Sequence, residues 1–187
     1  LLDQPNLKTF RLISHQYLNV DKISKLMLKF KKIEYLTLSI LNIDFKTISN
    51  IGLIGKNLKV IDISYPQNII EDVCLFILSK SCPKLVSVNF NGTEITNNGV
   101  FYLTQNCKHI EKISIAGTYI TDISFIYLSF YYPNLQFLEA AFNNITRIGI
   151  YNLLLRCKKL KYLNILNNVF SIKYLDEIYK KVKNNTI

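Results

Sequence analysis

Apolar residues return along this chain in a fixed pattern, L-x-x-L-x-L, whose seven copies begin 25 to 27 residues apart. Apolar and polar positions alternate at the end of each copy, which is typical of a short strand that buries one face. An internal period of this length predicts a solenoid, in which each repeat covers the apolar side of the next. The copies begin at Leu7, Ile33, Leu58, Leu85, Ile110, Leu135 and Leu160.

The second half of each repeat carries the signals of a helix. In the fifth repeat Thr121 is placed to act as the N-cap, and Asp122 suits the positive end of the helix dipole. Thr96 and Thr146 hold the same position in the neighbouring repeats. Two residues before the first apolar residue of each copy, only proline or lysine occurs. Proline ends a helix, and lysine complements the carbonyls exposed at a helix end. These residues are Pro5, Lys31, Lys56, Pro83, Lys108, Pro133 and Lys158.

Units of strand, turn, helix and turn predict an α/β fold, a right-handed leucine-rich repeat horseshoe of about seven repeats of 25–27 residues. A parallel β-sheet is expected on the inside and helices on the outside. Residues 1–187 are expected to form a single domain. A solenoid needs a polar cap at each end, and none precedes the strand at Leu7, so we expect an N-terminally truncated fragment of a longer protein. Residues 172–182 are expected to complete a last helix.

Composition agrees with a folded array, since 49% of the 187 residues are hydrophobic. No apolar run approaches the roughly 18 residues of a membrane span. Three of the four cysteines, Cys82, Cys107 and Cys157, each stand three residues before a strand and so share one structural slot. With no C-x-x-C motif or Cys/His cluster, they predict buried free thiols, no metal and no cofactor. Reduced thiols favour the cytoplasm or the nucleus.

The cysteine repeats resemble a known family. Cys82-Pro83-Lys84-Leu85, followed by its strand and by Ile95-Thr96-Asn97, resembles the cysteine-containing leucine-rich repeat, which reads C-P-x-L-x-x-L-x-L, a loop, then I-T-D and a helix. Cys107 to Asp122, and Cys157 with its strand, resemble the same pattern. The resemblance covers essentially the whole chain, although repeats one to three lack the cysteine.

This subfamily is typical of F-box proteins. The resemblance implies that the repeats select substrates for an SCF-type ubiquitin ligase, while a separate F-box segment holds the adaptor of the ligase. No F-box-like segment lies within these residues, so the adaptor is expected to bind upstream of them.

The variable positions beside the leucines are expected to point to the concave face and to bind a protein or peptide. Aromatic anchors beside small polar residues suit such a partner, although the aromatic rings could instead shield one another. The expected contact residues are Tyr35, Val60, Asp62, Tyr65, Asn89, Lys112, Phe137, Glu139, Phe142, Tyr162 and Asn164. The last variable column runs from Ser14 and Ile40 through Tyr65, Gly92, Gly117 and Phe142 to Asn167.

The chain carries a formal net charge of +10, and much of this charge stands where helices are expected to end. Stacked repeats would align these lysines into a basic rim. Such a rim is explained by solvated lysines that complement helix dipoles, or by an acidic partner segment; nucleic acid is the least favoured occupant. The expected rim residues are Lys31, Lys32, Lys56, Lys84, Lys108, Lys158 and Lys159.

We find no catalytic constellation in the sequence. His15 and His109 stand nearly four repeats apart, and Asp62 and Glu139 stand three repeats apart, so neither pair could share a site. Cys74 is expected to pack in a helix, because no base has a forced position near it. A non-enzymatic recognition module is therefore expected. A scaffold without a link to ubiquitin remains an alternative, and a GTPase-activating regulator is a less favoured one.

Overall fold

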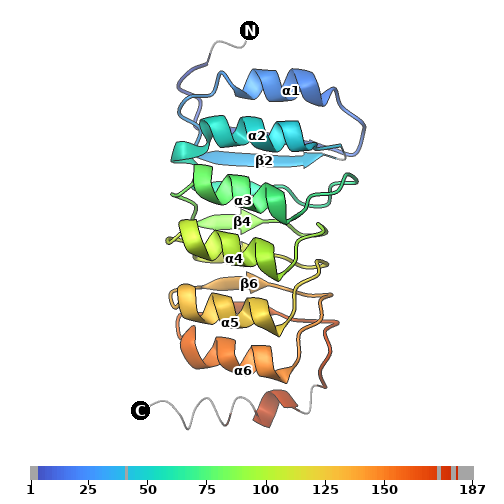
Figure 1. The fold of residues 1–187 in the computed structure, drawn as a ribbon, viewed down its shortest axis with the longest axis vertical. Coiled ribbons are helices and arrows are strands. Elements are labelled where there is room, and N and C mark those ends of the chain that lie inside the picture. The colour runs from blue at the N-terminus through green and yellow to red at the C-terminus, as the bar shows by residue number, and fades with distance from the viewer. Residues whose placement is uncertain (1–3, 41, 172–173, 178–179, 181–187) are drawn as a thin grey trace.

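The computed structural model describes residues 4–40, 42–171, 174–177 and 180, and these form one leucine-rich repeat solenoid. Seven parallel strands make a single sheet in chain order, β1 to β7, so each repeat adds one strand beside the previous one. Helices α1 to α6 form a layer over one face of this sheet (Figure 1). The predicted α/β repeat architecture is confirmed.

Each predicted strand, and each predicted helix before residue 172, is present, with short strands in all repeats but the first two. The strands are β1 (Thr9–Ser14), β2 (Tyr35–Ile40), β3 (Val60–Asp62), β4 (Ser87–Asn89), β5 (Lys112–Ser114), β6 (Phe137–Glu139) and β7 (Tyr162–Asn164). The helices are α1 (Val20–Met27), α2 (Phe45–Ile54), α3 (Asp72–Ser81), α4 (Asn97–Asn106), α5 (Asp122–Tyr131) and α6 (Arg147–Arg156), and a short 3-10 helix η1 covers Gly55–Asn57. Residues 174–177 of the expected last helix are helical, and most of the rest of 172–182 lies outside the described residues.

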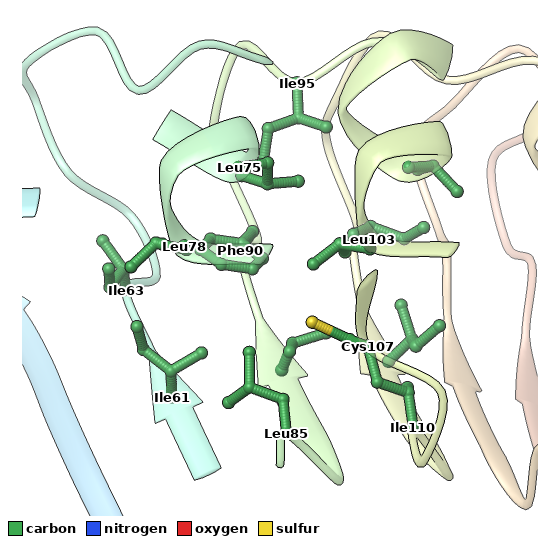
Figure 2. Close-up of a cluster of buried hydrophobic side chains, with 14 of the residues drawn as sticks. Ile61, Ile63, Leu75, Leu78, Leu85, Phe90, Ile95, Leu103, Cys107 and Ile110 are labelled. Atoms are coloured by element: carbon green, nitrogen blue, oxygen red, sulfur yellow. The ribbon is translucent and has the colours of Figure 1, made fainter. Parts of the chain in front are cut away.

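The predicted apolar columns build one continuous core between the sheet and the helices. The middle leucine column is a row of register partners, in which Ile61 pairs with Val88 and Ile113 pairs with Leu138. Side chains of neighbouring repeats interleave there with the inner faces of the helices (Figure 2). Burial of this kind stabilises a protein by roughly 25 cal/mol per Å² of apolar surface, so the core is the main source of stability.

Threonine caps three consecutive helices and links each one to the repeat before it. The Thr146 hydroxyl accepts a hydrogen bond from the Ile148 N–H (3.2 Å) and donates one to Asp122 Oδ2 (2.5 Å), while the Thr146 N–H donates to Asp122 Oδ1 (2.7 Å). Asp72 holds Thr96 in the same way. The predicted N-caps Thr96, Thr121 and Thr146 are thus confirmed. Asp72 and Asp122 each bind the cap of the following helix, and we call these two contacts aspartate clamps.

In repeats three to seven, the last variable column has a left-handed backbone conformation; it stands two residues after the third apolar position of the L-x-x-L-x-L pattern. Tyr65, Gly92, Gly117, Phe142 and Asn167 have φ between 54° and 68°. Ile40 was expected on the open face with this column, and that expectation is wrong, because Ile40 is 1% exposed. Strand β2 continues to Ile40 instead of turning, so the alternation of the strand directs this side chain into the core.

A buried asparagine holds the turn after β6. The Asn143 amide donates to the carbonyls of Ile115, Ala140 and Ala141, and its Oδ1 accepts from the Thr118 N–H and hydroxyl. Asn168 donates to Ala140 and Ile165 in the next turn. These side chains satisfy backbone groups that would otherwise lack partners where the sheet ends.

The shared cysteine slot is the C-cap of the helices. All four cysteines are free and buried, as predicted. Cys107 Sγ lies 3.5 Å from the Cys82 carbonyl oxygen, and Cys157 Sγ lies 3.4 Å from the Tyr132 carbonyl oxygen. Burial raises the pKa of Cys82 and Cys107 to about 12 and that of Cys157 to about 11, because it disfavours the thiolate.

Candidate partner-binding surface

Nine of the eleven expected contact residues, all except Tyr65 and Phe142, lie in two parallel rows on the face of the sheet opposite the helices, here called the sheet face. Sheet register aligns them, because each strand pairs residue for residue with the next. The first row is Thr9, Tyr35, Val60, Ser87, Lys112, Phe137 and Tyr162. The second row is Arg11, Thr37, Asp62, Asn89, Ser114, Glu139 and Asn164.

Five of the predicted residues surround one shallow hollow in the middle of these rows. The hollow has a volume of about 260 Å³. Its predicted lining residues are Val60, Asp62, Asn89, Lys112 and Phe137. Ser87 and Ser114 complete the polar lining, and they leave room because their side chains are small.

Asp62 brings an unsatisfied acceptor to this hollow. Its Oδ1 atom is buried and accepts no hydrogen bond from the described residues. Buried polar atoms in folded proteins are rarely left without a hydrogen-bond partner, which sets this carboxylate apart from the other lining residues.

Phe137, Glu139, Tyr162 and Asn164 form a preorganised cluster beside the hollow. The rings of Phe137 and Tyr162 are stacked, with centroids 4.3 Å apart and planes 5° from parallel. The Tyr162 hydroxyl and the Asn164 amide both donate to Glu139 Oε2 at 3.1 Å. The hydrogen bond to Glu139 is the largest cause of a raised Tyr162 pKa. The stacked rings of Phe137 and Tyr162 therefore cover each other on one face, and their remaining surface is open to a partner.

The remaining predicted aromatic residues stand more freely. Tyr65 and Phe142 are each 64% exposed, and Tyr35 is 42% exposed. Tyr65 lies over Gly92, where an added Cβ would come within 2.7 Å of the Tyr65 ring. Exposed rings fixed by the left-handed backbone therefore stand at the edge of the sheet face in repeats three and six. Tyr65 and Phe142 lie three repeats apart and do not form one cluster.

The sheet face has no net formal charge. Its two rows contain the cations Arg11 and Lys112 and the carboxylates Asp62 and Glu139. The excess positive charge of the chain therefore lies elsewhere.

All seven predicted rim lysines are exposed, near the ends of the helices and the starts of the strands. Lys108 Nζ donates to the Thr104 carbonyl at 2.5 Å in the last turn of α4, which is the capping role expected for this position. Lys84 Nζ donates to Asn57 Oδ1 at 3.0 Å.

A second hollow, of about 430 Å³, lies on this rim. It is lined by Lys8, Lys32, Glu34, Asn57, Lys59 and Lys84. Glu34 pairs with Lys59 at 2.7 Å and with Lys8 at 3.0 Å, and these two lysines lower its pKa. Lys32 and Lys84 carry no carboxylate partner among the described ion pairs, so the hollow keeps a positive excess.

The other chemically notable side chains are not brought together. His15 and His109 are both exposed and lie in different repeats. Cys74 is buried in α3, and burial raises its pKa. Within the described ranges, no group of three or more His, Cys, Asp or Glu side chains could hold a metal ion. No described helix has the length and apolar character needed to span a bilayer.

Ser87 and Ser114, which line the central hollow, lie in the variable columns expected on the concave face but were left out of the expected contact residues. The apolar outer side of helices α3 to α6 was also missed, although the unusually apolar helix from Asp122 to Tyr131 could have indicated it.

Comparison with known proteins identifies the fold and no family. No protein-family model matches the chain, and no curated protein matches it. Among solved structures, an internalin (inlF) from Listeria monocytogenes matches with a TM-score of 0.59 and 21% identity, over 95% of this chain and 46% of the internalin. Internalin C2 from the same organism matches with a TM-score of 0.64 and 21% identity, over 92% of this chain and 68% of that one. The chain thus spans less than half of the first internalin, and the likeness supports the leucine-rich repeat fold.

Proposed function

We propose that this protein is a protein-recognition module that binds an extended protein segment along its sheet face. The observation that carries the proposal is the pair of aligned side-chain rows, with exposed aromatic residues on either side of a small polar centre. Aromatic side chains at protein interfaces supply much of the binding energy, and small polar neighbours let a partner backbone approach.

The central hollow supplies specificity in this proposal. Asp62 is the one carboxylate among the described residues that line the hollow, so it favours a partner that presents an N–H group or a cationic side chain. The stacked pair Phe137 and Tyr162 stands beside it and offers apolar surface to the same segment. Tyr65 and Phe142 would hold the partner at the edge of the sheet.

Photo-crosslinking would test the proposed face. Benzoylphenylalanine replaces Phe142 in cells that produce the protein, and the crosslinked partner is identified by mass spectrometry. The same probe at Phe45, the first residue of α2, is the control, because that ring is 54% exposed and lies away from the sheet face. Purified partner should then bind the Phe137→Ala, Tyr162→Ala double variant at least about tenfold more weakly than wild type. Unchanged affinity of a variant that melts like wild type would contradict the sheet-face proposal.

We further propose that this recognition serves an SCF-type ubiquitin ligase in the cytoplasm or nucleus. The buried, unpaired thiols in the shared helix-end slot support this role, because the slot resembles that of cysteine-containing repeats in F-box proteins. Affinity purification of the natural full-length protein should recover a cullin and its adaptor. Recovery of the sheet-face partner without these subunits would favour a scaffold instead.

The basic rim is proposed as a secondary contact for an acidic protein segment. The hollow lined by Lys32 and Lys84 and their neighbours supports this, because its positive excess is not neutralised by the one carboxylate there. Partner affinity should fall with rising salt and with the Lys32→Glu, Lys84→Glu double variant. If neither salt nor the double variant changed the partner affinity, the role of these lysines would be limited to helix capping.

A further inference from the structure

The outer side of the helix layer carries an apolar surface that the fold itself does not require. Helices α3, α4, α5 and α6 each have ten residues, and their first residues are spaced by 25 residues along the chain. Equivalent side chains therefore line up across the layer. The fifth residue of each helix is large and apolar: Phe76, Phe101, Ile126 and Tyr151.

Helix α2 shows what the same positions contain when they face solvent. Its second, fifth and sixth residues are Lys46, Ser49 and Asn50. The corresponding residues of α5 are Ile123, Ile126 and Tyr127. Both helices lie in the same layer over the sheet (Figure 1), so the core does not require the change from polar to apolar at these three positions. The ninth residue is apolar and exposed in both helices, Leu53 in α2 and Phe130 in α5.

Helix α5 is the centre of this surface. Ile123 is 49% exposed and Phe130 is 58% exposed. A helix that is apolar on all sides is normally buried on all sides. We define the helix-face patch by the following six residues, which include partly buried members. They are Phe76, Phe101, Ile123, Ile126, Phe130 and Tyr151.

Cations border the patch where the helices end. Arg156 Cζ lies 4.0 Å from the centroid of the Phe130 ring, and Lys80 Nζ lies 4.3 Å from that of Phe76. Lys108 Nζ lies 5.4 Å from the Tyr131 ring. These contacts hold positive charge beside apolar surface, which favours an occupant with carboxylates at this border.

The opposite border of the patch, where the helices start, mixes both signs of charge, with one exposed cation, Arg147, at the start of α6. The four helices contain two carboxylates, Asp72 and Asp122, and both already accept hydrogen bonds from the next repeat. Glu71 and Glu94 are exposed near the same helix starts. A ten-residue helix is only about 15 Å long, so a flat anionic bilayer would meet these carboxylates as well as the cations. A narrow partner could contact the cationic border alone.

We propose that the helix-face patch docks an amphipathic α-helix of a partner protein, with its apolar side on the patch and its carboxylates against Lys80, Lys108 and Arg156. A helix is about 10 to 12 Å wide, which matches a contact restricted to the patch and one border. A second copy of this chain is disfavoured, because each copy carries a net charge of +10.

The test uses two fluorescent model peptides of about 18 residues, or five helical turns. Both have a leucine face; one has glutamates beside it, and the other has lysines at the same positions. In fluorescence anisotropy, the glutamate peptide should bind the wild-type chain at least about tenfold more tightly than the lysine peptide. The Ile123→Ser, Phe130→Ser double variant should lose this binding by a similar factor, and both side chains are exposed enough for the fold to tolerate the change.

Phe142→Ser is the matched control, because it removes an equally exposed ring from the sheet face. It should leave peptide binding unchanged while weakening the sheet-face partner, so the two proposals can fail separately. Equal binding of both peptides, or binding that survives the double variant, would overturn the docking proposal. Two other results would also overturn the docking proposal: binding of the chain to phosphatidylcholine–phosphatidylserine vesicles, or formation of a dimer in sedimentation, in either case if the Ile123→Ser, Phe130→Ser double variant abolished it.

Discussion

Single residues decide how neighbouring repeats join. Gly149 stands in α6 where a Cβ would come within 2.5 Å of Asp122 Oδ1, and Gly99 has the same relation to Asp72. Ser124 holds the equivalent place in α5, and its hydroxyl donates to Asn97 Oδ1 at 2.6 Å. In the next repeat, a glycine therefore lies against each aspartate clamp, because no side chain fits beside the carboxylate. A serine lies against the Asn97 amide instead.

Gly149→Ala should destabilise the protein by about 1–3 kcal/mol, although alanine is the better helix former. The reason is the clash with the Asp122 carboxylate, which cannot move without releasing Thr146. Urea unfolding followed by circular dichroism measures the loss. The same change in an Asp122→Ala background should cost less, and an equal cost in both backgrounds would show that the clamp is not responsible.

The buried thiols predict a loss of stability in alkaline solution. Unfolded cysteine has a pKa of about 8.5, whereas folded Cys107 has a pKa of about 12. Between these two pH values the unfolded chain releases a proton that the folded chain keeps. The buried thiol therefore leaves the free energy of unfolding undiminished below about pH 8.5, and it lowers this free energy as the pH rises toward about 12. Each thiol can contribute a slope of about 1 kcal/mol per pH unit.

Urea unfolding in reducing buffer at about pH 8 and about pH 10 checks this expectation. A variant with Cys82, Cys107 and Cys157 changed to alanine is the control, since it keeps all other titrating groups. Its stability should fall less steeply over this interval. Parallel curves for the variant and the wild type would contradict a folded pKa near 12.

At the scale of elements, helix starts depend on threonine more than on helix propensity. Thr146→Val keeps the shape of the side chain but removes the cap of Ile148 and the donor to Asp122. We expect a loss of about 1–2 kcal/mol in chemical unfolding. Thr37→Val makes the same chemical change on the open face of β2, away from any helix start, and should be near neutral. Equal effects of the two changes would rule out the capping explanation.

The order and type of the elements could be predicted from the sequence, because the apolar pattern and the helix-end residues repeat seven times and the threonine cap recurs in three consecutive helices. The exceptions are instructive. Ile40 was misplaced because nothing in the local pattern shows that β2 continues where later repeats turn. The role of Asn143 was also missed, because three of its five hydrogen bonds reach Ile115 and Thr118 in the preceding repeat, which a pattern within one repeat does not reveal.

At the scale of the whole molecule, stability follows from a core that runs through all repeats. Leu138 is fully buried between two neighbouring strands, whereas Leu163 in the same column is only partly buried. Leu138→Ala should cost about 2–5 kcal/mol, since it leaves a cavity enclosed on both sides. Leu163→Ala should cost clearly less in the same urea unfolding experiment. Similar losses at both positions would contradict a core that deepens toward the middle of the array.

The binding surface was predictable only in part, for a geometric reason. Alternation along a strand states which residues leave the core, so the two rows on the sheet face followed from the repeat. It does not state that Phe137 stacks on Tyr162, or that Asp62 lacks a donor, because these depend on contacts between repeats. The apolar outer side of α3 to α6 depends on a comparison with α2 that only aligned helices make visible.

The alternation of clamps between helix starts constrains how this protein can change its length. Removal of one repeat from the middle would set an aspartate clamp against Ser124, or Asn97 against a glycine that offers no hydroxyl. Removal or duplication of the α4 and α5 repeats together would keep the Asp–Gly and Asn–Ser junctions matched. The natural unit of growth for this part of the array is therefore a pair of repeats, and shortened or extended versions that tolerate the change should differ by about 50 residues, which is two repeat lengths.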